Sequence, residues 1–164
     1  MRLSLGPNLY YWTKEQTLDF YRQMAELPVD IIYLGETVCA KRKQLRPQDW
    51  IDLAEELTAA GKEVILSTLA LSEADSDVKT LKRICDNDRF MVEANDMGAV
   101  SLLQGKDFIS GHSINLYNER SIKLLADLGL KRWVLPVELS QDTLRDLHQN
   151  KPGHVETEVF AYGR

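Results

Sequence analysis

Short apolar runs rich in β-branched and aromatic residues alternate with helical patterns along the chain, and this alternation limits its fold more than any other feature. Seven runs are predicted as strands: residues 2–6, 30–35, 63–69, 90–94, 108–111, 132–137 and 156–162. Strands that alternate with helices over short connections form a parallel sheet covered by helices. Two architectures fit this pattern, a doubly wound open sheet and an incomplete (β/α)8 TIM-like barrel.

The composition is that of an ordinary globular domain, with 164 residues, 44% hydrophobic and 27% charged. Because no Pro/Gly/Ser-rich linker interrupts the chain, residues 1–164 are predicted to form a single partial barrel domain. The formal charge of −5 argues against a nucleic-acid partner. No apolar run reaches the roughly 18–20 residues that a membrane span needs. Two cysteines, Cys39 and Cys85, make no disulfide framework, so we expect a cytoplasmic protein.

Helix boundaries are marked by local signals. Thr13 and Gln16 form a predicted capping box, and Pro47 suits a first helical position. Ser72 or Ser76 is expected to cap the third helix. The predicted inner faces carry apolar side chains at helical spacing.

Polar side chains follow the predicted strands at their carboxyl ends, where ligands bind in both architectures. These side chains are Glu36, Cys39, Glu93, His112, Asn115, Glu138 and Arg164. They predict a small-molecule site at one edge of the sheet. The alternative stays open, because polar residues also end strands and cap helices in proteins without a site there.

Cys39 is flanked by Lys41 and Arg42, and neighbouring cations favour a reactive or metal-binding thiolate. Without a CxxC motif or a paired histidine, a lone cysteine is a weak metal signal. Walker, Rossmann, HExxH and GxSxG motifs are absent from the sequence. Cys85 lies on an apolar helical face and is predicted to be a buried small hydrophobe.

Several longer segments carry a resemblance to a known family. They are SLGP at residues 4–7, IYLGETVCAKR at 32–42, LSTLA at 66–70, GHSINLYN at 111–118 and PVELS at 136–140. With these segments the chain resembles the collagenase-like peptidases of unknown catalytic type, the U32-like family. Within that family it is most similar to the UbiV-like branch, which serves ubiquinone biosynthesis.

The resemblance implies a barrel fold and a role in oxygen-independent hydroxylation of the ubiquinone ring with a homologous UbiU-like subunit. It also implies a [4Fe-4S] cluster on four cysteines, of which Cys39 matches the first. The other three lie beyond the Tyr-Gly-Arg strand in the family, so we expect this chain to be the N-terminal part of a longer architecture. Prephenate is the implied hydroxyl donor, and Arg42 or Arg164 would pair with such an anion.

Within this hypothesis Glu36, His112, Asn115 and Glu138 are the candidate catalytic residues of the pocket at the sheet edge. A ubiquinone precursor would be the ring substrate. A second hypothesis is a non-catalytic binding or scaffold module, which would associate with a homologue or a second copy through open sheet edges. A third is a peptidase, although the sequence shows no zinc motif and no nucleophile–base pair.

Overall fold

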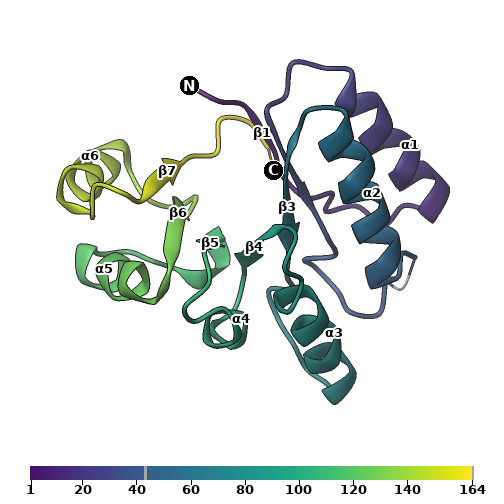
Figure 1. Cartoon of the computed structure of the whole chain (residues 1–164). Coiled ribbons are helices and arrows are strands. Elements are labelled where there is room, and N and C mark those ends of the chain that lie inside the picture. The colour runs from purple at the N-terminus through teal and green to yellow at the C-terminus, as the bar shows by residue number, and fades with distance from the viewer. Residues whose placement is uncertain (43, 164) are drawn as a thin grey trace. The chain divides into compact units, whose positions relative to one another are not determined.

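The computed structural model describes residues 1–42 and 44–163, in which seven strands alternate with helices (Figure 1). The chain forms two compact units, one of residues Met1–Val92 and a second that begins at Glu93. Strand β4 (Met91–Ala94) spans this boundary. The expectation of one domain over residues 1–164 stays a prediction.

In the described part of unit 1, three parallel strands and three helices precede β4. The strands are β1 (Ser4–Leu5), β2 (Ile31–Leu34) and β3 (Glu63–Ser67). The helices are α1 (Lys14–Ala25), α2 (Pro47–Ala59) and α3 (Asp75–Cys85). Strand β2 pairs in parallel with β1 on one side and with β3 on the other, and all of its residues are buried. Burial on both faces explains why β2 is an unbroken apolar run rather than an alternating one.

Unit 2 repeats the same pattern with shorter elements. Its strands are β5 (Phe108–Ser110), β6 (Leu130–Val134) and β7 (Glu156–Glu158). Its helices are α4 (Met97–Leu102), the 3-10 helix η1 (His112–Ile114), α5 (Glu119–Leu128) and α6 (Gln141–Asn150). Strand β6 pairs in parallel with β5 and with β7.

The strand order in the sheet follows the chain order from β1 to β7. A doubly wound sheet reverses its order at a switch point, whereas a (β/α)8 barrel keeps the chain order. The α/β class with seven parallel strands of the incomplete TIM-like type is therefore confirmed. Each strand is shorter than predicted. Strand β4 loses only its first predicted residue, and β6 begins two residues earlier and ends three residues earlier than predicted.

The helices bury the apolar faces that their periodicity predicts. Tyr21 of α1 and Ala54 of α2 are fully buried, as are Cys85 of α3 and Ile122 of α5. Among the described residues, no helix has the length and apolar character required to cross a membrane. The hydrophobic core is thus formed between the strands and one face of each helix.

Two of the three helix starts predicted from local sequence signals are confirmed. The Thr13–Gln16 capping box is present, and Pro47 is the first residue of α2. The predicted cap of α3 by Ser72 or Ser76 is wrong. The Asp77 carboxylate instead accepts hydrogen bonds from the backbone N–H groups of residues 73 and 74, at 3.2 and 3.1 Å. Asp77 is the third residue of α3 and accepts N–H groups at and before the N-cap residue Ala74, whereas a serine cap would accept an N–H group of the first helical turn.

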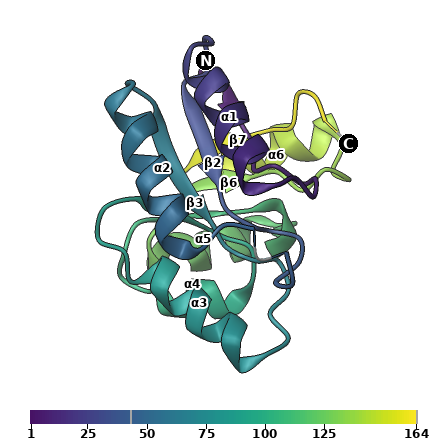
Figure 2. The same cartoon turned by 90° about the vertical axis from the view of Figure 1, so that its right-hand side faces the viewer.

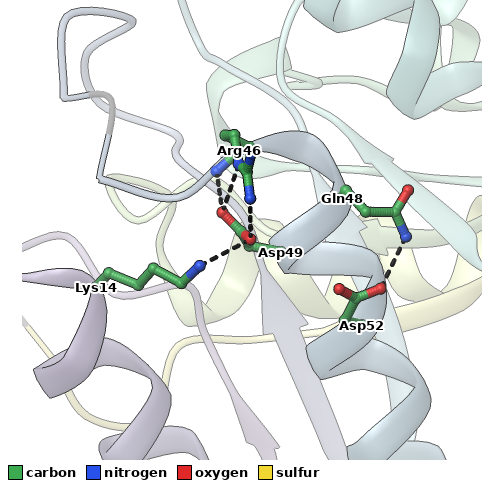
Figure 3. Close-up of polar contacts among 5 residues, drawn as sticks. All are labelled: Lys14, Arg46, Gln48, Asp49 and Asp52. Atoms are coloured by element: carbon green, nitrogen blue, oxygen red, sulfur yellow. Dashed lines mark hydrogen bonds and ion pairs between the residues drawn. The ribbon is translucent and has the colours of Figure 1, made fainter.

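Helices α1 and α2 lie side by side in both views of the molecule (Figures 1 and 2). A charged contact joins them, because Lys14 Nζ of α1 lies 2.8 Å from Asp49 Oδ1 of α2 (Figure 3). The other oxygen of Asp49 accepts the Arg46 backbone N–H at 2.7 Å and so begins α2. The Lys14 hydrogen bond is the main cause of a strongly lowered pKa at Asp49, and the Arg46 N–H adds to it.

Candidate functional site

The carboxyl end of β2 leads into the loop that carries Cys39. Gly35 is the first residue of this loop and determines the direction in which the chain leaves the strand. The φ angle of Gly35 is +152°, and a Cβ there would lie 2.3 Å from the carbonyl oxygen of Ser67 in β3. Only glycine combines this backbone angle with so close an approach. The start of the Cys39 loop is therefore fixed against the end of the neighbouring strand.

The Glu36 carboxylate shapes the same loop. Its Oε1 atom accepts the backbone N–H of Val38 at 2.9 Å and that of Cys39 at 3.1 Å. Glu36 is half-buried and holds Cys39 at a defined place after the strand. This contact gives Glu36 a positioning role, and its predicted catalytic role stays a prediction.

Cys39 is half-buried, so its thiol lies at the boundary between loop and solvent. A turn closes behind it, because the Arg42 backbone N–H donates to the Cys39 carbonyl oxygen at 3.0 Å. The Arg42 guanidinium donates to the Leu9 carbonyl oxygen at 2.9 Å and lies 6.0 Å from the centre of the Tyr11 ring. Arg42, predicted to bind an anion, thus joins the loops after β1 and β2.

Two buried hydroxyls belong to this end of the strands. Thr37 is 7% exposed and Ser67 is fully buried. Neither hydroxyl oxygen has a hydrogen-bond partner among the described residues. Buried hydroxyls without partners are costly, so a water or a ligand group is expected to satisfy them.

A complete iron–sulfur site is not formed by the described residues. Cys85 is fully buried on the inner face of α3, which confirms its predicted structural role. No group of three or more His, Cys, Asp or Glu side chains in the described parts of the chain is arranged to hold a metal ion. A cubane cluster requires four ligands, and Cys39 is the one cysteine located in a loop at a strand end.

The corresponding end of unit 2 is built around Gly111, which follows β5. A Cβ at Gly111 would lie 2.0 Å from Asn95 Oδ1 and 3.0 Å from Glu93 Oε1. Asn95 in turn donates to Glu93 Oε2 at 3.1 Å, and both residues are buried. The absence of a side chain at Gly111 therefore makes room for this buried polar pair.

His112, Tyr117 and Glu138 form a polar cluster in unit 2. The Tyr117 hydroxyl donates a short hydrogen bond to Glu138 Oε1. This bond is the main cause of a raised pKa at Tyr117 and of a lowered pKa at Glu138. Burial lowers the pKa of His112, and the nearby Glu138 charge partly offsets this effect. The Phe160 ring packs edge-on against the imidazole, with ring centres 5.2 Å apart.

Asn115, a further predicted site residue, ends the short helix η1. Asn115 is exposed and adopts a left-handed backbone conformation with φ of 58°, and its N–H donates to the His112 carbonyl oxygen at 3.2 Å. It therefore ends η1, a role for which asparagine is well suited. Arg164, the second predicted anion-binding residue, lies outside the described residues.

Two polar features of unit 2 are not predicted from the sequence. Tyr117 carries no local signal of a role, because its partner Glu138 lies in another loop. Arg132 is 4% exposed on β6, and its Nε lies 2.8 Å from Glu156 and 3.7 Å from Glu158 of β7. An arginine inside an apolar run, opposite two glutamates at alternate positions, is a signal that would have found this cluster.

The fold and these loops define a protein of the TIM-like barrel class with polar side chains at the carboxyl ends of its strands. A family model described as "Peptidase family U32" matches residues 16–164. The chain therefore belongs to peptidase family U32.

Proposed function

We propose that this chain is a subunit of an oxygen-independent, iron–sulfur-dependent hydroxylation system for ubiquinone biosynthesis. It would act in the cytoplasm as a UbiV-like protein with a UbiU-like partner subunit. Membership of family U32 supports this proposal. The observation that carries it is the Cys39 loop, in which Gly35 and Glu36 hold a half-buried thiol at the end of β2.

Cys39 would supply one thiolate ligand to a [4Fe-4S] cluster. The described residues do not complete that ligand set, so the remaining thiolates would come from outside them. For this reason we assign no chemical step to the cluster. Arg42, with Arg164, would pair with the carboxylates of an anionic donor such as prephenate, because a guanidinium binds a carboxylate through two parallel N–H groups.

His112 is the residue best suited to move a proton in unit 2. Its lowered pKa leaves the imidazole neutral near pH 7, so it can accept a proton from a reacting hydroxyl group. The Glu138 charge would stabilise the imidazolium that forms. Tyr117 would orient Glu138 through the hydrogen bond between them. In this proposal His112 would act as a general base with Glu138 as the supporting carboxylate.

The proposal is tested by replacing the chromosomal gene with variants and measuring ubiquinone in cells grown with and without oxygen. Cys39→Ser is expected to abolish anaerobic ubiquinone synthesis and to leave aerobic synthesis unchanged. Cys85→Ser is the matched control, since the Cys85 thiol is fully buried in α3 and is expected to support synthesis in both conditions. Normal anaerobic ubiquinone in the Cys39→Ser strain would contradict the proposed function.

A further inference from the structure

Three consecutive aromatic residues, Tyr10, Tyr11 and Trp12, follow β1 in unit 1. Tyr10 is 58% exposed and Tyr11 is 64% exposed. Large aromatic side chains are usually removed from water, and a group of them at a strand end indicates a binding surface. We call this group, together with Arg42, the aromatic shelf.

The shelf is held rigidly rather than left as a loose loop. The Asn8 side chain accepts the Tyr10 N–H at 3.0 Å and donates to the Tyr10 carbonyl at 3.3 Å. The Asn8 N–H donates to the hydroxyl of the fully buried Tyr21 at 3.0 Å. Gln44 donates to the Tyr11 hydroxyl at 2.9 Å. These contacts fix the chain on both sides of the exposed rings.

A series of ring contacts joins the exposed end of the shelf to the core. Tyr10 stacks with Trp12 at 6.2 Å between ring centres, with an interplanar angle of 15°. Trp12 packs edge-on against Phe20 at 5.2 Å, and Phe20 packs against Tyr21 at 5.3 Å. The planes of Tyr10 and Trp12 are therefore set before any ligand arrives, which lowers the entropic cost of stacking a planar ring on them.

Arg42 places a cation at the same surface. It lines a shallow hollow together with Tyr10, Trp12 and Glu36. One of the five N–H groups of the Arg42 guanidinium donates a hydrogen bond to the Leu9 carbonyl oxygen. Glu36 adds a negative charge, but its Oε1 already accepts two backbone N–H groups. The hollow encloses about 20 Å³, the space of roughly one water, so a ligand would lie across its opening.

From these contacts we propose that the aromatic shelf binds a small planar ring that carries a carboxylate. The ring stacks on the face of Tyr10 that Trp12 leaves open, and the carboxylate pairs with the Arg42 guanidinium. A purely apolar ring would form no ion pair with Arg42. A non-planar anion would not stack on the aromatic rings. This inference extends the carboxylate-binding role that the proposed function gives to Arg42. Its test measures binding without any cofactor, so it can fail while the proposed hydroxylation stands.

The test uses benzoate as the probe, with the indole N–H resonance of Trp12 followed by NMR on the full chain. Cyclohexanecarboxylate has the charge without the aromatic ring, and phenol has the ring without the charge at neutral pH. Benzoate is expected to bind about tenfold more tightly than either of them. Equal affinity for benzoate and cyclohexanecarboxylate, or no shift of the Trp12 resonance, would overturn the proposal.

Single substitutions in the aromatic shelf test which side chains contribute to benzoate affinity. Tyr10→Leu and Arg42→Lys are each expected to weaken benzoate binding by roughly tenfold, the second because lysine keeps the charge but lacks the planar fork. Leu27→Ala is the matched control, since Leu27 is an exposed apolar residue of unit 1 that follows α1 and does not line the hollow. It is expected to leave the affinity unchanged. Equal affinity in Tyr10→Leu and the unmodified chain would also overturn the proposal, provided that circular dichroism shows both to be folded.

Discussion

Replacement of Gly35 by alanine is expected to destabilise unit 1 by about 2–5 kcal/mol, as the sum of two effects. The first is the positive φ of +152°, which costs an L-residue about 1–2 kcal/mol. The second is the 2.3 Å approach of the new Cβ to the Ser67 carbonyl oxygen, for which overpacking costs about 1–3 kcal/mol. The Ser67 carbonyl belongs to β3 and cannot move away without disturbing the sheet.

Alanine substitutions at two other glycines of unit 1 distinguish the cost of the positive φ angle from the cost of the close Cβ contact. Gly61 has a φ of +87° with open space around the position of a Cβ, so Gly61→Ala is expected to cost only the backbone term of about 1–2 kcal/mol. Gly6 has neither feature, and Gly6→Ala is expected to change stability by less than about 0.5 kcal/mol. Urea unfolding followed by circular dichroism and tryptophan fluorescence measures all three. A Gly35→Ala cost no larger than that of Gly61→Ala would refute the close approach of the Cys39 loop to β3.

Two pH-dependent effects are also expected. The Asp49 carboxylate, whose pKa is lowered by Lys14, stabilises the fold above pH ~4 and loses this effect as the pH falls. Asp49→Asn is therefore expected to cost about 1–2 kcal/mol at pH 7 in urea unfolding and much less at pH 2. Asp52→Asn is the matched control, because the Asn amide oxygen can still accept the Gln48 hydrogen bond, and it is expected to change the unfolding free energy little at either pH; equal pH profiles for the two variants would contradict the role of Asp49. His112 is expected to titrate below pH 6.5 by NMR, and Glu138→Gln should lower its pKa further; an unchanged pKa in that variant would rule out their electrostatic coupling.

The fold was largely predictable because its signals are local. The apolar run of β2, the Thr13 capping box and Pro47 each report on a few neighbouring residues. The choice between an open sheet and a barrel was not predictable from pattern, because it depends on which strands pair. The strand order supplied that information.

The candidate site was predictable only in part. The strand-end positions of Glu36, Cys39 and His112 follow from the alternation of strands and helices. Their contacts do not, since the Tyr117–Glu138 bond joins residues 21 positions apart. The sequence also gives no sign that one oxygen of Glu36 accepts two backbone N–H groups, which is a property of the folded loop.

The central claim is that Cys39 binds an iron–sulfur cluster in the native protein. The most direct test is the iron and sulfide content of the protein captured anaerobically from its own cells with any partner attached, together with its intact mass. We predict about four irons and four sulfides per subunit, with the cluster lost in Cys39→Ser and retained in Cys85→Ser. Native protein without iron, or a Cys39→Ser variant with its full iron content, would contradict the account.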